Sequence, residues 1–531
     1  MSTITTPASE DLIDRLRQIV GADHVRTDEA TLALFSQDIY ARAPQMAACV
    51  VAPAGTDELA RVVAASTRSG RAVTPRGAGM SYSGGYLPTE AGSVMLDMRR
   101  MDRILDINAD DMIVTAEVGC TWAALNAALK EKGLRTPFFG PLSGLVSTIG
   151  GGLAQNNAFF GAGRYGPLSE SVTALRVVLA DGTILDTGSA ATRGGPPFFR
   201  HYGPDLTGLF LGDSGAFAIK AEAALRLIEA PQSEGYASFA FPSRDGALAA
   251  MSSISRAGLG AEVFGFDPNL QRVRMKRASL ASDVGVLAGV VKRQNSLLAG
   301  VKEAAKVVVA GRDFVGEREY SVHMTAEGRS AAAVEADLEA ARALARRAGG
   351  REIENTIPKV VRANPFAPLN NMIGPDVERW APVHGILSHS RAAPAWAEID
   401  RFFSEAEAEF RAHGVTTGCL FTSISTNAIL IEPVFYWPSA LGALHRESVE
   451  AWLLNKVTRF PPNPEADRTV ARARRRIAEI FLAFGAAHFQ VGKETYLYRE
   501  SRSAAFLALL ESIKSAVDPQ RLVNPGSLGL Q

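Results

Sequence analysis

The segment VTPRGAGMSYSGGYLP, residues 73–88, places four glycines, two serines and two tyrosines before the strand-like segment SVMLDMRRM, residues 93–101. Glycine at this density costs conformational entropy, so such a loop usually marks a place where the backbone approaches another group closely. Gly77 and Gly79 are not followed by a third glycine that opens a helix, and the chain has no GxxxxGK[ST] loop. The segment therefore predicts a closely held ligand, bound by neither standard nucleotide motif.

The sequence around this loop alternates strand and helix patterns. Residues 46–74 predict a strand, a helix capped at Thr56–Asp57 and a second strand that runs into the loop. Residues 112–133 predict another strand, followed by a helix from about Thr121 to Gly133. The first glycine loop thus ends a strand–helix–strand unit.

Two more glycine-rich segments follow. The first spans residues 140–172 and leads into a predicted hairpin that turns at Asp181–Gly182. The second, DLTGLFLGDSGAFAIKAEAALRLI, spans residues 205–228. Glycine loops attached to strands and helices form backbone nests that bind anions, so together they predict one extended ligand that carries phosphate.

The rest of the chain has a different composition and pattern. From about residue 236, Ala/Arg/Glu-rich helical patterns enclose strand-like runs such as residues 419–437, which predict a second domain of helices over a sheet. A length of 531 residues also favours two domains. The C-terminal residues 505–531 return to a helix and a Pro/Gly turn, and we expect them to complete the first domain.

The composition excludes several functions. The chain has 56 lysines and arginines and 56 aspartates and glutamates. It therefore has no net positive charge that would attract nucleic acid or an anionic membrane. Cys49, Cys120 and Cys419 lack metal or disulfide spacing and are expected to be small buried residues in a reducing compartment. The acidic N-terminus is unlike a secretory signal, and no apolar run is long enough to span a bilayer. We therefore expect a cytoplasmic protein.

Five blocks carry a resemblance to a known family. They are VTPRGAGMSYSGG, the segments 101–129, 147–185 and 205–227, and DPQRLVNPG, residues 518–526. In this order and spacing they resemble the FAD-linked oxidases of the vanillyl-alcohol oxidase / p-cresol methylhydroxylase type, which include glycolate-oxidase-subunit-like proteins. The resemblance covers about residues 45–230 and the last thirty or so.

The resemblance implies an α+β protein with FAD as cofactor. Residues 1–235 would form a two-part PCMH-type FAD-binding domain, and residues 236–495 a cap domain with an antiparallel sheet and helices. Residues 496–531 would return to the FAD-binding domain. Hydride transfer from a substrate to the flavin would be the chemistry.

The same resemblance assigns cofactor-binding residues. In the first loop, Arg76, Gly77, Ala78, Gly79 and Ser81 would offer backbone N–H groups to the FAD pyrophosphate, and Pro75 and Met80 would also contact the cofactor. The second segment would contribute Ser147, Thr148, Ile149, Gly150, Gly151, Asn156, Tyr165 and Gly166, and the later segments Gly215, Ile219 and Asn524. Many relatives attach FAD through a histidine where this chain has Met80. Others attach it from a cap strand, where this chain has Thr426, Asn427 and Ala428 in place of the expected histidine or tyrosine, so we expect non-covalent FAD.

Departures from two branches of the family bear on the substrate. The 2-hydroxy-acid branch has paired metal-binding histidines, whose counterparts here, FTSISTNAI and HFQVGK, lack the pair, and we predict no metal site. The phenol branch has a tyrosine in the first loop, matched by Tyr82, but its phenolate-binding arginine is replaced by Gln490 and its aspartate by Ser143 or Gly144. Tyr82 is therefore a candidate catalytic residue.

Three other residues are candidates for the chemistry. His488 lies in a block that meets the active site in related proteins and could be the base or a core histidine. Glu432, inside an apolar strand, is either on a solvent face or buried for a reason. Arg499 could bind an anionic or phenolic oxygen, as could its neighbours Lys493, Tyr496 and Tyr498. Tyr436 and Trp437 could line an aromatic pocket or a core, and His384 and His389 are predicted to be structural.

We predict an FAD-dependent oxidoreductase, an oxidase or a dehydrogenase, that takes hydride from a small hydroxylated molecule of phenolic or aryl-alcohol type in aromatic compound catabolism. One alternative is a 2-hydroxy-acid dehydrogenase without the usual metal, and another is a non-catalytic flavin-binding subunit. The predicted partner is a small-molecule substrate, with no nucleic acid and no membrane. The sequence does not identify the electron acceptor, for which oxygen, a cytochrome and a quinone are the alternatives. It does not fix the oligomeric state either, and a homodimer is one possibility.

Overall fold

The computed structural model describes residues 10–280, 316, 318–456, 459–493 and 496–530. A four-stranded sheet with the order β1-β2-β4-β3 comes first, and its strands β2, β4 and β3 run parallel. Its elements are α1 (Glu10–Val20), β1 (Val25–Arg26), α2 (Glu29–Phe35), β2 (Cys49–Val51), α3 (Thr56–Arg68), β3 (Val73–Arg76) and β4 (Val94–Asp97). The predicted strand–helix–strand unit before the first glycine loop is confirmed.

A five-stranded antiparallel sheet with the order β5-β6-β10-β8-β9 follows. Its strands are β5 (Ile104–Asn108), β6 (Ile113–Glu117), β8 (Val172–Val178), β9 (Ile184–Asp186) and β10 (Ile219–Arg226). The elements inserted among them are α4 (Trp122–Lys130), β7 (Leu134–Arg135), α5 (Ile149–Gln155), α6 (Ala162–Tyr165) and α7 (Leu206–Leu209). Thr121 caps α4 as predicted, and its hydroxyl accepts the Ala124 N–H at 3.2 Å. Leu59, Val114 and Leu225 share one hydrophobic core, so this sheet and the first pack as a unit.

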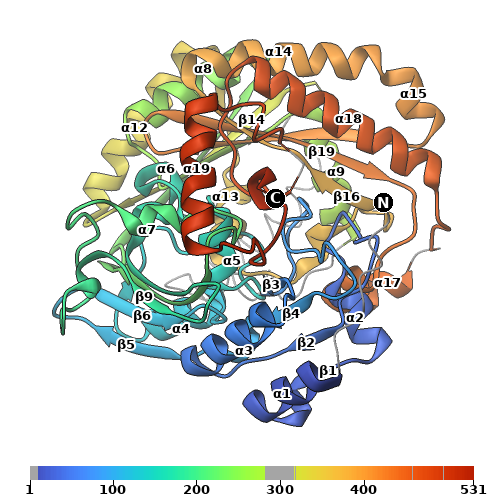
Figure 1. The fold of residues 1–531 in the computed structure, drawn as a ribbon. Helices are drawn as coiled ribbons and strands as arrows, with labels where there is room; N and C mark the ends of the chain where they lie inside the picture. The colour runs from blue at the N-terminus through green and yellow to red at the C-terminus, as the bar shows by residue number, and fades with distance from the viewer. Residues whose placement is uncertain (1–9, 281–315, 317, 457–458, 494–495, 531) are drawn as a thin grey trace.

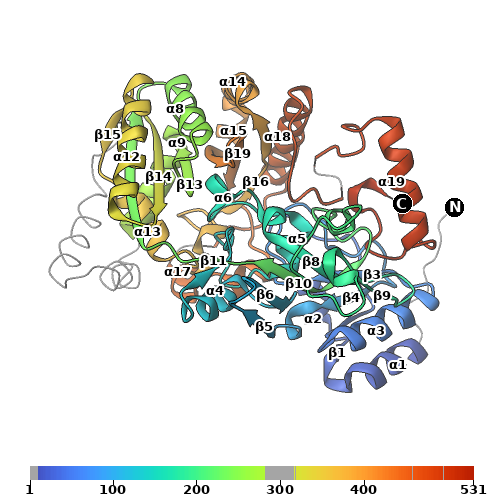
Figure 2. The same ribbon diagram turned by 90° about the vertical axis from the view of Figure 1, so that its left-hand side faces the viewer.

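An eight-stranded antiparallel sheet forms the other half of the molecule (Figures 1 and 2). Its order is β15-β12-β14-β13-β18-β19-β16, with β17 also paired to β19. The strands are β12 (Ser233–Phe241), β13 (Glu262–Phe266), β14 (Tyr320–Gly328), β15 (Arg351–Ile353), β16 (Arg379–Pro382), β17 (Gly385–Ser388), β18 (Thr416–Ile424) and β19 (Ala428–Trp437). The short β11 (Ile228–Glu229) pairs with β7 outside this sheet.

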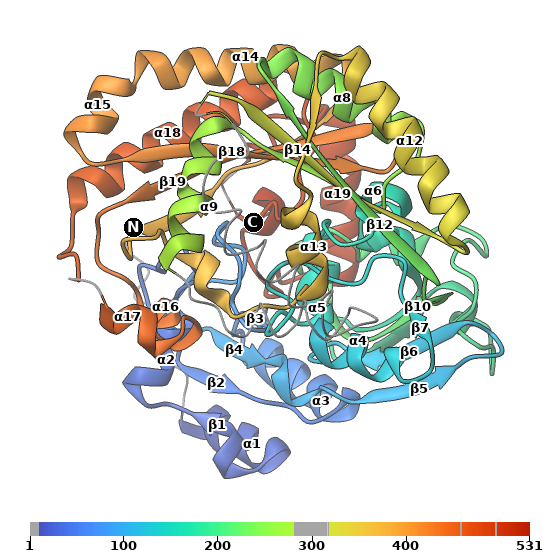
Figure 3. The ribbon, with the colours of Figure 1, turned by 180° about the vertical axis from the view of Figure 1, so that it is seen from behind.

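Helices cover one face of the eight-stranded sheet (Figure 3). The helices of this half are α8 (Arg244–Arg256), α9 (Pro268–Leu280), α12 (Ala331–Arg347), α13 (Thr356–Ala363), α14 (His389–Glu405), α15 (Glu407–Ala412), α16 (Ala443–Ser448), α17 (Ala451–Lys456) and α18 (Pro464–Ala483). Ile429, Ile431 and Phe435 of β19 join the core under α8, α14 and α18. Leu430 and Val434 alternate with them and lie on the opposite face. The predicted domain of helices over a sheet is confirmed.

That opposite face, which we call the inner face, looks toward the glycine segments. Phe159 and Phe160, from the N-terminal half, pack in one cluster with Phe264 and Val434 of the sheet. We call this the aromatic cluster, and its buried members are Phe139, Phe159, Phe160, Phe264, Phe266, Leu270, Leu420, Val434 and Tyr436. The inner face therefore forms one wall of the space between the two halves.

The C-terminal segment packs on the N-terminal half. Helix α19 (Ala504–Val517) contributes Leu510 to that core, and Val523 pairs with Val73 beside β3. Lys514 is buried and donates to Asp518 at 2.6 Å and to the carbonyl of Ala216 at 2.6 Å. The expected return of the tail is thus seen, while the domain boundaries at residues 235 and 495 stay predictions.

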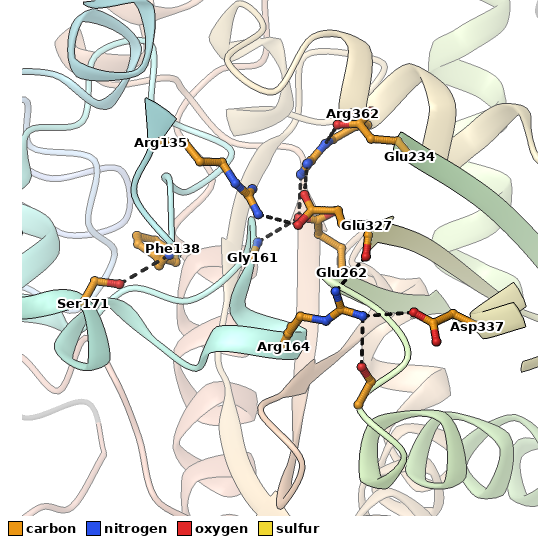
Figure 4. A network of polar contacts seen from close by, with 11 residues as sticks. Arg135, Phe138, Gly161, Arg164, Ser171, Glu234, Glu262, Glu327, Asp337 and Arg362 are labelled. Carbon is orange, nitrogen blue, oxygen red and sulfur yellow. Dashed lines mark hydrogen bonds and ion pairs between the residues drawn. The ribbon is translucent and has the colours of Figure 1, made fainter. Parts of the chain in front are cut away.

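A buried ion cluster joins the two halves (Figure 4). Arg362 of α13 donates to Glu262 at 2.8 Å and also to Glu327, which in turn accepts from Arg135 of β7. Glu262 accepts the N–H of Gly161 at 2.8 Å, so both halves contribute to the cluster. Burial raises the pKa of Glu262 despite the nearby arginines. The fit of the cap over the N-terminal half thus depends on buried charges.

Removing Arg362 should destabilise the protein strongly. Arg362→Met leaves buried carboxylates without their cation, and breaking a buried pair in this way costs about 3–5 kcal/mol. Arg411→Met is the control, because Arg411 forms an exposed pair with Glu407 and should change the free energy of unfolding by about 0.5 kcal/mol or less. Urea unfolding measures both. Equal midpoints for the two variants would contradict the structural role of the cluster.

None of the helices in the described ranges has both the length and the apolar character needed to cross a bilayer.

Candidate active site

The structure brings the glycine segments together around one cleft. The cleft is lined by Pro75, Arg76, Gly77, Tyr86, Met98, Val118, Thr148, Gly150, Gly151, Ala154, Gly215, Ala218 and Lys220. A Cβ on Gly77 would lie 2.4 Å from Thr148 Oγ1, so only glycine allows the first two segments to meet here. Gly79 has φ +76°, and a Cβ there would collide with the Arg76 guanidinium. The dense glycines therefore let three loops share one site.

Arg76 places a buried positive charge at this cleft. Its Nη1 donates to the carbonyl of Leu34 at 2.9 Å, and the guanidinium lies over the Phe35 ring at 4.5 Å. Its Nε is buried and has no hydrogen-bond partner among the described residues. Burial lowers the pKa of Arg76 to about 10, so it remains charged at neutral pH. An anionic group such as a pyrophosphate would supply the missing partner.

Buried amide oxygens provide a second test of whether a flavin nucleotide fits. Asn524 donates to the carbonyls of Gly85 at 2.9 Å and Ser214 at 2.6 Å, while its Oδ1 accepts from none of the described residues. Gln155 Oε1 and Gln490 Oε1 are also buried acceptors with no donor in the described part of the chain. A flavin nucleotide carries N–H and ribityl O–H donors, so the residues present fit FAD.

Sequence reasoning named seven of the lining residues and missed the other six. The six are Tyr86, Met98, Val118, Ala154, Ala218 and Lys220. Lys220 could have been found from the sequence, because it is a charged residue inside the apolar run FAIKAEAAL. In the structure its ammonium group forms an ion pair with Asp213 at 2.6 Å.

Several predicted cofactor residues also have structural contacts. Ile149 and Ile219 lie in the hydrophobic core, and Asn156 ends α5 with its Oδ1 accepting the Ser169 N–H at 3.0 Å. Tyr165 lies 5.6 Å from the Arg135 guanidinium, at the ion cluster. The backbone around Ala78, Met80, Ser81, Ser147 and Gly166 continues the same loops, and a direct flavin contact by any of these residues stays a prediction.

Tyr82 lies at the inner face of the eight-stranded sheet. Its buried ring stands perpendicular to Trp380 and His384, with centroid distances of 5.7 and 6.1 Å. Its hydroxyl accepts a hydrogen bond from Gln490 Nε2 at 3.0 Å, and Arg474 of α18 donates to its carbonyl at 2.9 Å. Burial raises the pKa of Tyr82, so the phenol is neutral. No described residue accepts its own O–H proton, so this proton can be donated to an oxygen of a substrate.

Glu432 is the carboxylate on the same inner face. Strand alternation places it between Leu430 and Val434 and opposite Leu420 of β18. Burial raises the pKa of Glu432 to about 7, and the positive charge of Arg274 opposes that rise. Its negative charge also raises the pKa of Tyr82. The side chain of Glu432 is half-buried, and none of the described residues forms a hydrogen bond with its carboxylate.

The histidines lie behind Tyr82 in a fixed arrangement. His384 Nε2 donates to the carbonyl of Phe489 at 2.6 Å, so its Nδ1 accepts the hydroxyl of Tyr496 at 3.0 Å. His488 Nδ1 donates to the carbonyl of His384 at 2.7 Å, and its ring stacks on Tyr496 at 4.3 Å. Burial lowers the pKa of His384 to about 3 and that of His488 to about 4, so both are neutral. Tyr496 and His384 therefore separate His488 from Tyr82.

The other candidates do not reach this group. Arg499 is partly exposed and pairs with Glu511 of α19 at 2.7 Å. Tyr436 belongs to the aromatic cluster, whereas Trp437 packs in the helix-covered core. His389 contacts Ser252 Oγ at 3.1 Å, in keeping with a structural role. The structure thus places Tyr82 and Glu432 at the inner face of the sheet and Arg499 at the surface.

No cluster of three or more metal-ligating side chains is found in the parts of the chain that the structure describes. Cys49, Cys120 and Cys419 are buried thiols, as predicted.

Known proteins resemble this chain in sequence and in structure. Residues 47–188 match the FAD binding domain, and residues 464–528 match the C-terminal domain of FAD linked oxidases. The glycolate oxidase subunit GlcD of Bacillus subtilis is 30% identical over 249 residues, which cover 47% of this chain and 51% of that protein. The probable mitochondrial D-lactate dehydrogenase of Danio rerio is 31% identical, covering 48% of this chain and 50% of that protein. The chain spans about half the length of the curated relatives it matches.

The structural likeness extends over the whole chain. p-Cresol methylhydroxylase with substrate bound superposes with a TM-score of 0.72 at 16% identity, covering 99% of this chain and 98% of that one. At this identity the likeness concerns the fold alone. The matched domains, the shared fold and the cleft of glycine segments agree, and they make this chain similar to the FAD-linked oxidases of the PCMH type and support FAD as its cofactor.

Proposed function

We propose that this protein is an FAD-dependent oxidoreductase that oxidises a small hydroxylated molecule of phenolic or aryl-alcohol type. One observation carries the proposal: Glu432, whose pKa burial raises to about 7, lies on the sheet face walled by the aromatic cluster, and the buried phenol of Tyr82 packs against Trp380 at the same cluster. A carboxylate poised near neutral pH is suited to general base catalysis. Aromatic walls exclude water and match a flat apolar substrate.

Different residues hold the substrate, take its proton and orient the groups that do so. When bound, FAD supplies the hydride acceptor. Glu432 takes the hydroxyl proton of the substrate, and Tyr82 donates a hydrogen bond to the same oxygen or to a phenolic one. Gln490 orients the Tyr82 hydroxyl, and Arg474 fixes its backbone by bridging the carbonyls of Tyr82 and Pro382. We assign the base to Glu432 and a positioning role to His488, because His384 and Tyr496 separate His488 from Tyr82.

A 2-hydroxy acid is the second candidate substrate. It is supported by the names of the curated relatives, a glycolate oxidase subunit and a D-lactate dehydrogenase. Non-covalent attachment of FAD is proposed from Met80 in the first loop. The cytoplasmic location and the small-molecule partner also remain proposals drawn from the sequence.

Anaerobic bleaching of the flavin absorbance tests the proposal. The panel holds para-substituted phenols, aryl alcohols and D-2-hydroxy acids, each mixed with purified holoenzyme. Reduction by an aromatic member is expected. Reduction by aliphatic hydroxy acids alone would move the assignment to the second candidate, and no reduction by any member would favour the non-catalytic flavin-binding subunit.

Removing the Tyr82 hydroxyl should slow flavin reduction moderately. Tyr82→Phe deletes one hydrogen-bond donor to the substrate and leaves Gln490 Nε2 without its acceptor, and such a loss is worth about 1–3 kcal/mol, or roughly 5–150-fold in rate. Tyr86→Phe is the matched control, because Tyr86 lines the cofactor cleft and accepts from Gln155 at 2.5 Å. The control should change FAD affinity rather than the reduction rate of bound flavin. Stopped-flow reduction separates the two, and equal rates in Tyr82→Phe and wild type would remove Tyr82 from the reaction.

A further inference from the structure

Two charged residues line the cleft of glycine segments, and both are cations. They are Arg76, the last residue of β3, and Lys220, near the start of β10. The other lining residues are neutral, so no carboxylate of the described chain lines the cleft. Two positive charges on one cleft match a doubly anionic ligand such as a pyrophosphate.

Asp213 fixes the position of the Lys220 ammonium. Its Oδ1 accepts from Lys220 Nζ at 2.6 Å and from the backbone N–H of Gly215 at 3.0 Å. The lysine and aspartate side chains are buried, with 4% and 1% of their surfaces exposed. An ammonium carries several N–H donors, and among the described residues only Asp213 accepts from this one. Because Lys220 lines the cleft, its remaining donors can bind a ligand there.

The same contacts connect Lys220 with the first glycine loop. Gly215 shares Asp213 Oδ1 with the ammonium and has φ +71°. A Cβ on Gly215 would lie 3.3 Å from Pro75 Cγ, so this third segment packs against the residue that precedes Arg76. The two cations therefore enter the cleft from segments that contact each other.

Stability alone does not account for a buried pair at this place. Desolvation of an ammonium and a carboxylate offsets much of their attraction, and apolar residues of similar volume often replace such a pair without loss of stability. Lys220 stands between Ile219 and Ala221, which both belong to the hydrophobic core. A lysine in this apolar strand is explained if its charge binds a ligand in the cleft.

We propose that Lys220 binds the pyrophosphate of FAD together with Arg76, and that Asp213 positions the ammonium for this contact. The two side chains supply positive charge, and the glycine segments supply backbone N–H groups to the same phosphates. The inference concerns the cofactor and goes beyond the proposed substrate, and its test does not require that any substrate reduces the flavin.

Two variants separate a cofactor contact from a structural ion pair. Asp213→Asn keeps an oxygen for Gly215 and Lys220 and removes the neutralising charge, so its apoprotein should bind FAD at least as tightly as the wild type. Asp213→Asn/Lys220→Met leaves no lone buried charge and should bind FAD about 10–100-fold more weakly, because it lacks a charge-assisted hydrogen bond. Quenching of flavin fluorescence during titration of apoprotein measures both dissociation constants.

The two roles predict opposite results. A purely structural pair predicts that the double variant binds FAD like the wild type, and this result would overturn the proposal. The proposal also fails if Asp213→Asn folds and loses as much affinity as the double variant, since the ammonium would then contribute nothing. If Asp213→Asn does not fold, the double variant decides.

ADP and adenosine show which part of the cofactor Lys220 contacts. Both compounds carry adenine and ribose, but only ADP carries a diphosphate. In competition with FAD, wild-type apoprotein should bind ADP at least about 100-fold more tightly than adenosine, and the double variant should lower this ratio about tenfold or more. Equal affinities in the wild type, or equal losses for both compounds in the double variant, would overturn the proposal.

Lys130→Met is the control for the change of charge. Lys130 is exposed at the end of α4 in the same half of the molecule, so this variant loses one positive charge without touching the cleft. Its dissociation constants for FAD and ADP should stay within about twofold of the wild-type values, because an exposed charge is screened by solvent and salt. A loss as large as that of the double variant would assign the effect to net charge and contradict a direct contact.

Discussion

Glu432→Gln should slow anaerobic flavin reduction by roughly 10²–10³-fold while FAD remains bound, because general bases contribute about that much to such reactions. The substitution keeps the size and shape of the side chain and removes only its ability to take a proton. Glu432 lies on the inner face of the eight-stranded sheet and is not among the residues that line the cleft of glycine segments, so the flavin content should match that of the wild type. Stopped-flow absorbance at saturating substrate measures the effect.

The pH profile gives this prediction a second readout. Since burial raises the pKa of Glu432 to about 7, the wild-type rate should rise as pH increases through 7 and then reach a plateau. The Glu432→Gln rate should be flat over the same range. His488→Gln is the comparison variant, because its imidazole is already neutral with a pKa near 4 and lies behind Tyr496. If His488→Gln flattens the profile and Glu432→Gln does not, the base is His488.

Stability separates a catalytic defect from a folding defect. The pKa of Glu432 is raised from its ordinary 4.5 to about 7, so the folded protein binds more protons than the unfolded chain between these pH values. Wild-type stability should therefore fall as pH rises from 4.5 to 7 through this group. Glu432→Gln has no such titration and should be at least as stable as the wild type at pH 8. A lower melting temperature at pH 8 would show that the carboxylate has a structural role.

The sequence predicted the N-terminal half well for a physical reason. The loop of residues 73–88 packs against Thr148. Any residue other than glycine at position 77 would place its Cβ 2.4 Å from Thr148 Oγ1, which is too close. Such a constraint is local and leaves a visible pattern in the sequence. The strand–helix–strand unit, the Asp181–Gly182 hairpin and the returning tail were all readable from local signals of this type.

The substrate side was harder to predict because long-range packing decides it. Glu432 could be on either face of its strand, and only the pairing of β18 with β19 places it inward. His488 and Arg499 are near Tyr496 in sequence, yet one lies behind that ring and the other pairs with Glu511 at the surface.

Gly151→Leu should give a folded protein that has lost nearly all of its FAD. Gly151 lines the cleft, and a Cβ there would have only Thr148 Oγ1 within 4 Å, at 3.5 Å, so a side chain fits the protein but fills the cleft. The residue lies inside α5, where glycine is less favourable than leucine by about 0.5–1 kcal/mol, so the fold itself gains. Flavin absorbance relative to protein should fall below about a tenth of wild type, because a side chain in a close-packed site excludes the ligand.

Two measurements make this result specific for the cleft. Ala127→Leu adds a similar side chain to the exposed face of α4 and should retain full flavin content. Added FAD should raise the melting temperature of wild-type apoprotein and of Ala127→Leu but not that of Gly151→Leu, since only a bound ligand stabilises the folded state. A Gly151→Leu protein that purifies yellow would place the flavin elsewhere, because the leucine side chain and the cofactor cannot share the space between Arg76 and α5.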